Sequence, residues 1–421
     1  METMAKTLIS ASFLLKIASL RTRARLLTGL RKMVGLKPHQ DISAEQWDVL
    51  TAQLAAVSNK INGQLRVYTD HYLSEQNDVA TRQILINRLG ELEMELTAAY
   101  TFYDTFLDML TQRLSDDIGP LLRGCDRIAA DALQRSFLAE TTVPPLVYCD
   151  RGFGASTLRE GVHLSKNIPN PIPFIAIPYS RMMEKYNLIS INHEVGHQAL
   201  IKLNMVGLWQ QVFKEALKKA AAPPIIQDLY ANWAKEIVPD FWAFCLSGMA
   251  QTCSIRDVLV LPTPMMFSIS TLQPHPPSYL RFLVSVECCR QMWGQGDWDG
   301  WEIEWLTLYP TIDLDEATRQ IIIDAQQYIP VAAKALLQTK FKKLGNKPLT
   351  SLFDMAVLNP KTLKKWANVL ARNAATEGSL SAEFKALPIG AQLAVFRLMR
   401  EKRTVKQGDI DRLMTNWLKN L

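Results

Sequence analysis

The chain lacks the cysteine patterns of zinc fingers, zinc ribbons and disulfide-rich secreted domains. It has six cysteines in 421 residues, and no two of them form a C-x-x-C pair. A chain of this length can build a large hydrophobic core and does not depend on a disulfide framework. We therefore expect six buried, free thiols in a reducing compartment.

The sequence also lacks a membrane-spanning segment and a convincing signal peptide. No uncharged run of about 18 residues or more looks like a span. The stretch 258–280 carries no charge but contains five prolines. The stretch 7–20 is apolar, but Lys16 interrupts it and no small-residue cleavage site follows it cleanly. We expect a soluble, cytoplasmic protein.

Internal repeats and nucleic-acid-binding modules are missing as well, although the charge is unevenly distributed. Residues 1–40 hold eight lysines and arginines against one acid, and residues 331–421 hold seventeen against six. Because the net charge is +6, the middle of the chain carries −12. The basic ends bind an anionic partner or membrane surface, or they dock on the acidic middle or are solvated helix faces. The sequence leaves these interpretations open.

The composition is that of a globular protein, with 48% hydrophobic and 21% charged residues. Residues 1–140 predict an N-terminal helical region, because apolar residues recur at helical spacing from 83 to 110. These are Ile86, Leu89, Leu92, Met94, Leu96 and Tyr100. Residues 311–421 predict a basic C-terminal helical region, interrupted near 345–348, 359–360 and 388–390 by glycine and proline.

The region between them, residues 141–310, contains short apolar strands, many prolines and seven of the ten tryptophans. We expect these tryptophans to pack in the core. The predicted fold class is therefore mostly α with a small β-sheet (α+β), and the sheet belongs to this middle region.

The strongest functional signal is the stretch 193–197, which reads H-E-V-G-H. Residues four apart on a helix lie one above the other, so His193 and His197 can present two imidazole nitrogens to one ion. Neutral imidazoles suit zinc, and a zinc-bound water loses its proton near neutral pH. Glu194 can reach that water, and Gly196 leaves room for close packing. The pattern predicts a metal site together with a general base; the alternative is a surface helix with two incidental histidines.

A zinc hydrolase needs a third protein ligand. Leu200 and Leu203 occupy the glycine and histidine positions of the longer H-E-x-x-H-x-x-G-x-x-H pattern, so a downstream carboxylate is expected instead. Glu215 lies among lysines on a charge-laced face. Glu236 lies in the largely apolar run 233–244, where a bare charge is expensive to bury and zinc would be its partner.

Asp240 follows Glu236 by one helical turn and can accept the free N–H of a ligating histidine, which would fix the tautomer of that ring. Pro239 is tolerated here if the helix begins near Lys235, since the first turn needs no N–H from it. An alternative role for Glu236 is to satisfy the dipole at the start of this helix.

With these residues the sequence resembles the gluzincin metallopeptidases, especially the compact minigluzincin type. The resemblance rests on His193, Glu194 and His197, followed by Glu236 and Asp240 as the E-x-x-x-D of a second helix. It covers about residues 140–290 and implies a zincin-like metallopeptidase domain, placed here at 141–310. It implies one zinc per chain bound by the two histidines and Glu236, with Glu194 as general base and later proton donor. The gap from His197 to Glu236 is longer than in thermolysin-like enzymes.

Two further segments are similar to those of gluzincins. The stretch 172–179 (I-P-F-I-A-I-P-Y) precedes the motif helix, where such enzymes have an edge strand that pairs with a peptide substrate. Its apolar, β-prone residues and its prolines also favour a short edge strand. The stretch 273–281 resembles the H-P-P-x-x-x-R segment of some members of the family.

His275 is a catalytic candidate, because peptide hydrolysis builds negative charge on a carbonyl oxygen and a positioned donor stabilises it. Tyr179 and Tyr279 are alternative donors, and Arg281 can hold a carboxylate or a substrate chain end. The alternative for His275 is a proline-braced loop in which it caps a helix that begins near Ser278.

The sequence therefore predicts a soluble intracellular metallopeptidase that cleaves a peptide or protein substrate, in which Glu194 activates a zinc-bound water. The alternative is a catalytically silent, zinc-stabilised scaffold that binds an anionic partner through its basic helical ends. A Glu194→Gln change separates the two, because it removes cleavage from the first and alters nothing in the second.

Overall fold

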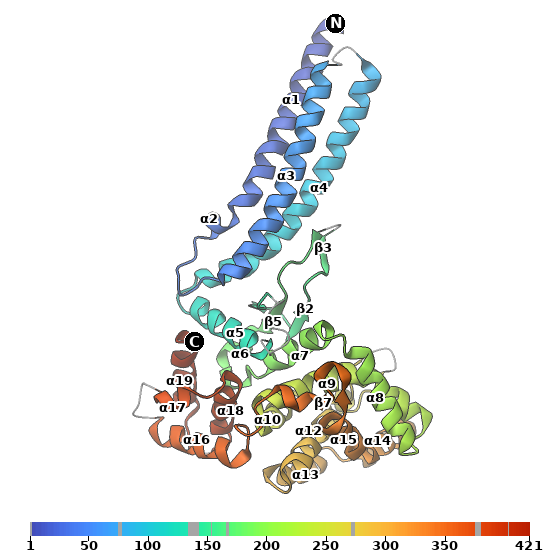
Figure 1. The fold of residues 1–421 in the computed structure, drawn as a ribbon, viewed down its shortest axis with the longest axis vertical. Helices are drawn as coiled ribbons and strands as arrows, with labels where there is room; N and C mark the ends of the chain where they lie inside the picture. The colour runs from blue at the N-terminus through green and yellow to red at the C-terminus, as the bar shows by residue number, and fades with distance from the viewer. Residues whose placement is uncertain are drawn as a thin grey trace. The chain divides into compact units, whose positions relative to one another are not determined.

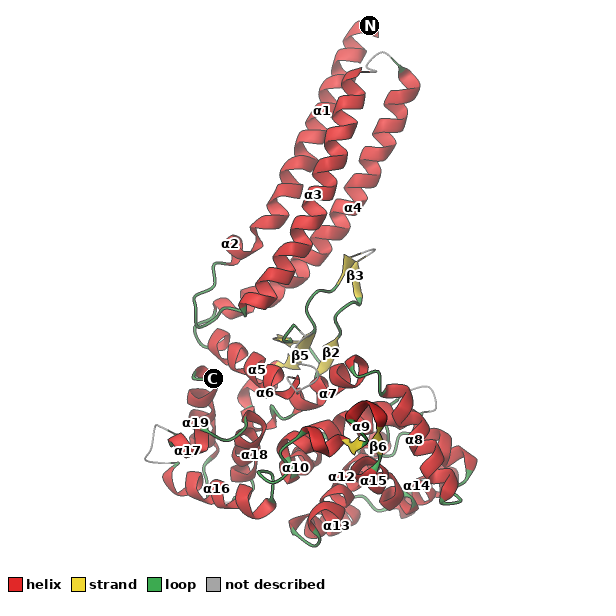
Figure 2. Ribbon diagram, in the orientation of Figure 1, coloured by secondary structure: helices red, strands yellow, loops and turns green. Residues whose placement is uncertain are grey.

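The structure of the 421-residue chain is a computed structural model. It describes residues 2–74, 78–133, 143–152, 154–165, 168–270, 274–374, 380–402 and 404–421, without the side chains of 2–10, 164, 165 and 168. Helices dominate these ranges and the strands are short (Figures 1 and 2). The predicted fold class, mostly α with a small β-sheet, is confirmed.

The chain forms two compact units. The first comprises Met1–Arg123 and Leu158–Phe174, and the second comprises Gly124–Thr157 and Ile175–Leu421. Helix α5 (Ile118–Leu133) contains the boundary between them. The segment 158–174 thus groups with helices that precede it by more than 40 residues. The boundaries at residues 140 and 310, which come from composition, stay predictions.

The first unit is built on three long helices that lie side by side: α1 (Glu2–Leu26), α3 (Ala44–Ser74) and α4 (Val79–Thr111) (Figure 1). A short helix, α2 (Leu30–Val34), follows α1. A small hairpin of β3 (His163–Ser165) and β4 (Ile168–Pro169) contacts α4. Apolar residues spaced three to four positions apart pack between these helices. Among them, the rings of Phe13 and Tyr72 stack with their centroids 4.1 Å apart.

The helix predicted from the periodicity at 83–110 is α4, and its buried stripe differs in part from the predicted one. Leu89, Leu92 and Leu96 are buried as expected. Ile86 and Met94 are exposed instead, at 47% and 71%. The α-helical repeat of 3.6 residues turns these two positions away from α1 and α3.

A three-stranded sheet in the order β1-β5-β2 belongs to the second unit except for its end residues Leu158 and Phe174: β1 (Leu146–Asp150), β5 (Phe174–Pro178) and β2 (Ser156–Leu158). The strand predicted at 172–179 is therefore present as β5, but the prediction of an edge position is wrong. All five β5 residues are buried and strands flank it on both sides. An all-apolar strand is typical of an interior position, where neither face meets water.

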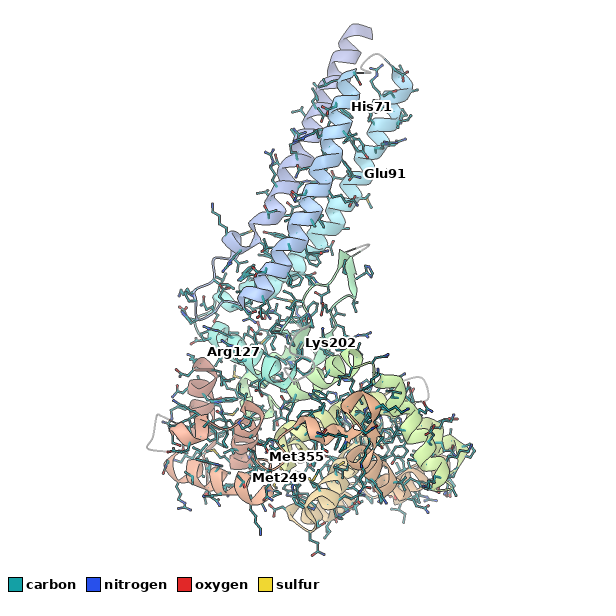
Figure 3. All side chains as sticks on the ribbon, viewed as in Figure 1. His71, Glu91, Arg127, Lys202, Met249 and Met355 are labelled. Atoms are coloured by element: carbon teal, nitrogen blue, oxygen red, sulfur yellow. The ribbon has the colours of Figure 1, made fainter. Side chains whose placement is uncertain are left out.

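Most of the second unit is helical. After the sheet come α6 (Tyr179–Met183), α7 (Ser190–Lys202), α8 (Val206–Lys219), α9 (Pro224–Ser247), α10 (Met249–Val258), α11 (Thr263–Met266) and α12 (Ser278–Trp293). The rest of the unit consists of α13 (Asp297–Leu308), α14 (Glu316–Gln327), α15 (Ile329–Gln338), the two-residue strands β6 (Lys340–Phe341) and β7 (Lys347–Pro348), α16 (Pro360–Asn373), α17 (Ala382–Lys385), α18 (Ile389–Arg400) and α19 (Gln407–Lys419). Figure 3 marks Lys202 and Met249, which end α7 and begin α10.

Helix α9 begins earlier than the sequence suggested. The expectation that a helix starts near Lys235 is wrong, since α9 begins at Pro224 and contains Pro239 in its interior. A proline there removes one backbone N–H and leaves the carbonyl four residues earlier, at Lys235, without its helical partner. Tertiary packing outweighs this cost, because the segment from Glu236 to Ser247 is buried throughout.

Close contact between α7 and α9 depends on a glycine. A Cβ atom at Gly196 would lie 2.8 Å from the Cα of Pro239 and 3.0 Å from the Cβ of Trp242. The two helices therefore approach more closely than any larger residue at 196 would permit. The expected role of Gly196 in close packing is confirmed.

The core of the second unit is rich in aromatic rings. Five of the seven tryptophans of the middle region are buried to within 2% exposure: Trp209, Trp233, Trp242, Trp298 and Trp305. All six cysteines are free and buried, as expected. Among the helices of the described ranges, none has a stretch long and apolar enough to cross a bilayer.

Candidate metal centre

The H-E-V-G-H stretch lies in the middle of α7, and its two histidines face the same way. His193 is buried and His197 is half-buried. Their Nε2 atoms lie 3.1 Å apart, and the two rings meet edge to face. Two imidazole nitrogens are thus directed at one point from successive turns of one helix.

Glu236 on α9 supplies a carboxylate at the same point. Its Oε2 lies 3.4 Å from His193 Nε2, and its Oε1 lies 3.6 Å from His197 Nε2. Within the described residues these three side chains form the one group of metal-ligand type, with ligand atoms within 4.8 Å of one another. Glu215, the other carboxylate considered, is exposed on α8 and accepts a hydrogen bond from Gln211.

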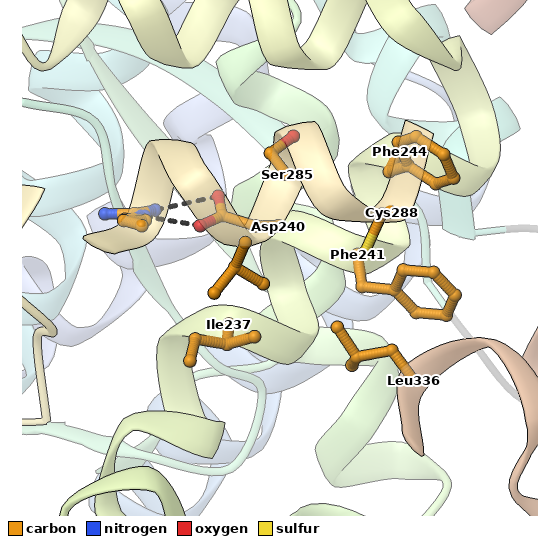
Figure 4. Close-up of a pocket in the computed structure, with 9 residues that line it drawn as sticks. Ile237, Asp240, Phe241, Phe244, Ser285, Cys288 and Leu336 are labelled. Carbon is orange, nitrogen blue, oxygen red and sulfur yellow. Dashed lines mark hydrogen bonds and ion pairs between the residues drawn. The ribbon is translucent and has the colours of Figure 1, made fainter. Parts of the chain in front are cut away.

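Asp240 and Arg281 both contact His193, and Arg281 Nη2 lies 3.3 Å from each nitrogen of its ring. Asp240 Oδ1 lies 2.8 Å from His193 Nδ1. Arg281 on α12 donates to Asp240 through two nitrogens, Nε to Oδ2 and Nη2 to Oδ1, the latter at 2.9 Å (Figure 4). This forked pairing fixes the carboxylate, which in turn fixes the orientation of the imidazole. The sequence analysis expected Arg281 to hold a carboxylate or a substrate chain end, and in the structure it holds the carboxylate of Asp240.

Glu194 lies beside the ligand cluster with only 6% of its surface exposed. Burial raises the pKa of its carboxyl to about 7, with a further upward push from Glu236 and a downward one from His193. A carboxyl with a pKa near neutrality can both accept and release a proton under physiological conditions.

The other charged groups have pKa values displaced in opposite directions. Burial opposes charge on His193, but Asp240 and Glu236 outweigh it and raise the pKa of His193 to about 9. Burial and the neighbouring His193 lower the pKa of His197 to about 3. Burial works to raise the pKa of Glu236, yet His193 and Arg281 lower it to about 2. Glu236 is therefore a carboxylate and His197 a neutral imidazole at neutral pH.

His275 approaches the cluster from the segment before α12. Its Nε2 lies 3.5 Å from Glu236 Oε1, and its side chain is 60% exposed. Helix α12 begins at Ser278, with Pro277 as its N-cap residue, and both roles considered for His275 stay predictions. Gln273, the first residue of the predicted 273–281 segment, lies outside the described residues.

The two tyrosines singled out from the sequence lie differently. Tyr279 is 2% exposed, and its hydroxyl donates to Gln326 Oε1 at 3.2 Å. It is a packing residue whose hydroxyl is already engaged. Tyr179 begins α6 and is 50% exposed. The structure records no contact between Tyr179 and the histidines.

Two contacts of the site were not predicted from the sequence. Gln198, which follows the second histidine, donates from Nε2 to the hydroxyl of Thr157 in β2 at 2.6 Å. This bond fastens the motif helix to an outer strand of the sheet. Gln251 on α10 points its Nε2 at Asp240 Oδ1 over 3.4 Å. Both partners are distant in sequence, so spacing gave no signal for either.

A small cavity adjoins Asp240 (Figure 4). Its volume of about 10 Å³ suits about one water molecule and excludes a substrate side chain. The residues that line it come from α9, α12 and α15: Ile237, Asp240, Phe241, Phe244, Arg281, Val284, Ser285, Cys288 and Leu336.

Comparison of the chain with protein-family models, with curated proteins and with solved structures finds no match. The case for any function therefore rests on the residues of this site.

Proposed function

We propose that this chain is a zinc-dependent metallopeptidase of the gluzincin type. The observation that carries the proposal is the convergence of two imidazole nitrogens and one carboxylate beside a buried glutamate. His193, His197 and Glu236 would hold the metal, and Glu194 is the acid–base residue. Burial and freedom of all six thiols support a reducing compartment, and we propose the cytoplasm.

The donor set fits zinc in both chemistry and size. Bond lengths of about 2.0–2.2 Å in a tetrahedral site place neighbouring ligand atoms about 3.3–3.6 Å apart. The two Nε2 atoms lie 3.1 Å apart here, and the two oxygens of Glu236 lie 3.4 Å from His193 Nε2 and 3.6 Å from His197 Nε2, so the carboxylate faces both rings. The neutral imidazole of His197 and the ionised carboxylate of Glu236, directed at one point, are ligand types that zinc prefers.

Bound zinc would supply Lewis acidity, which activates water and polarises a carbonyl group. Glu194 takes a proton from water and later delivers it to the departing amine, for which its pKa of about 7 is suited. Asp240 keeps His193 in one orientation, and Arg281 keeps Asp240 in place. His275, exposed beside Glu236, is the proposed donor to the carbonyl oxygen.

The test of the metal site is the zinc content of the purified full-length protein, measured by elemental mass spectrometry. We expect about one zinc per chain, as the single three-ligand group of the described residues requires. A Glu236→Ala variant should lose most of it, whereas Glu215→Ala, which removes an exposed carboxylate on α8, should keep it. Equal zinc in both variants, or none in the reconstituted wild type, would refute the site.

The test of the activity is peptide-library cleavage by the wild type and by Glu194→Gln. We expect cleavage by the wild type and a loss of at least about 100-fold in the variant, with zinc content unchanged. The alternative function, a zinc-stabilised scaffold that works through its basic ends, predicts zinc in both proteins and cleavage by neither.

A further inference from the structure

The side of α1 that faces away from the bundle is unusually apolar. Phe13, Ile17, Leu20 and Ala24 are buried against the neighbouring helices. Helical geometry places a second group opposite them, within about 120° of the helix circumference. This group, the α1 outer face, consists of Leu14, Leu15, Ala18, Thr22, Arg25 and Leu26. Its three leucines are exposed by 41%, 70% and 59%.

The cations around this face lack acidic partners. No acid occurs between residues 11 and 34. Arg25 lies on the face, Arg21 lies at its rim, and Lys32 follows in α2; none has an ion pair within the part of the chain that the structure describes. The positive charge here is therefore not neutralised by the unit itself.

Other basic residues of the same segment behave differently. Lys16 and Arg23 both pair with Glu93 of α4, and the hydroxyl of Tyr100 donates to the carbonyl of Arg23. Lys37 pairs with Asp116. The paired cations Lys16 and Arg23 thus join α1 to α4, while the unpaired Arg21 and Arg25 lie beside or on the face that carries the exposed leucines.

The combination of exposed leucines and unpaired arginines favours one kind of binding partner for the α1 outer face over others. Nucleic acid would satisfy the charge but leave the leucines in water. A second copy packed in parallel would bring Arg25 close to its own equivalent, which costs free energy, and an antiparallel copy would offer it no acid, since none occurs between residues 11 and 34. A surface of anionic lipids satisfies both, because leucines enter the acyl boundary while arginines meet the head groups.

We propose that the α1 outer face binds anionic membrane surfaces peripherally. The helix lies along the interface, with Leu14, Leu15 and Leu26 inserted and Arg21 and Arg25 on phosphate or carboxylate head groups. This inference is independent of the proposed peptidase activity, since none of these residues belongs to the metal centre.

The test is co-sedimentation of the full-length protein with phosphatidylcholine vesicles that contain either no or about 30% phosphatidylserine. We expect binding to the anionic vesicles alone, weakened by added salt. Replacing Arg21 and Arg25 by glutamine should lower the partition coefficient about five-fold for each arginine. Leu15→Ser with Leu26→Ser should reduce it at least as much, because insertion is lost.

Matched controls come from α3 of the same bundle. Arg66 and Val67 are exposed there, Val67 by 61%, so Arg66→Gln and Val67→Ser make the same chemical changes on another helix. Circular dichroism and zinc content should be unchanged in every variant. Equal binding to both vesicle types, equal losses in the α3 variants, or self-association that the leucine variants abolish would each overturn the proposal.

Discussion

Arg281 is the residue that holds the geometry of the proposed metal centre without being one of its proposed ligands. Its guanidinium is 14% exposed and pairs through two nitrogens with Asp240, which is 9% exposed. A forked contact restrains both position and rotation of a carboxylate, whereas a single ammonium contact restrains position alone. The orientation of His193 therefore depends on a side chain from a third helix.

Replacing Arg281 by methionine should weaken zinc binding by about 10- to 100-fold, because Asp240 then no longer holds His193 in one orientation. It should also lower the free energy of unfolding by about 3–5 kcal/mol, since a buried carboxylate loses its cation. Arg281→Lys should show smaller losses of both. Zinc affinity is measured by competition with a chelator, and stability by denaturant unfolding.

The matched control on α12 is Arg290→Met. Arg290 pairs with Glu287, Asp299 and Glu302, away from the histidines. That variant should lose stability but retain wild-type zinc affinity. An unchanged affinity in Arg281→Met would show that Asp240 needs no support from Arg281.

At the residue scale, the sequence predicts which side chains of the site lie together only where they are close in the chain. Two histidines four residues apart on one helix face the same way in any helical fold, so their convergence was predictable. The bond from Arg281 to Asp240 spans 41 positions and two helices. Its existence depends on how α9 and α12 pack, which no spacing rule reports.

At the scale of elements, the contact between α7 and α9 decides whether the ligands meet. The two histidines come from α7 and the carboxylate from α9, so the separation of the two helix axes sets the ligand distances. Gly196 lies at their closest approach.

Gly196→Ala should push α7 away from α9, because its Cβ would lie 2.8 Å from the Cα of Pro239. We expect a loss of about 1–3 kcal/mol in stability from overpacking and a weaker zinc affinity as the ligands separate. The control is Gly207→Ala in α8, where a Cβ meets nothing within 4 Å and the better helix propensity of alanine should be neutral or stabilising. Calorimetry with and without zinc distinguishes the two. Equal behaviour of both variants would contradict the role assigned to this contact.

The presence of individual helices and strands was predicted better than their position relative to other elements. The helix at 83–110, the strand at 172–179 and the helix start at Ser278 follow from periodicity, β-propensity and proline placement. The edge position of that strand was wrong, because order within a sheet depends on strands that pair from elsewhere in the chain. The helix start considered near Lys235 was wrong, because the burial of α9 outweighs the cost of Pro239 in its interior, which helix propensity alone does not predict.

At the scale of the whole molecule, every proposed zinc ligand belongs to the second compact unit. The sequence could not anticipate this division. Composition cannot show that residues 158–174 group with the helices of the first unit.

Zinc should therefore stabilise one unit selectively. At 100 times its dissociation constant, a ligand that binds the folded state alone adds about 2.7 kcal/mol to its stability. Amide hydrogen exchange should slow in α7 and α9 and stay unchanged in α3 and α4. Glu236→Ala should abolish the effect, and equal protection of α3 would contradict the assignment of the site to the second unit.

The buried thiols provide a second way to measure the stabilisation of the second unit by zinc. Cys288 lines the cavity next to Asp240, and burial raises the pKa of the adjacent Cys289 to about 12. Such thiols do not react with alkylating reagents until the surrounding helices separate. The rate at which they are alkylated therefore measures how often the protein opens transiently. If zinc stabilises the second unit, this rate should fall when zinc binds, and the native cysteines report it without an added probe.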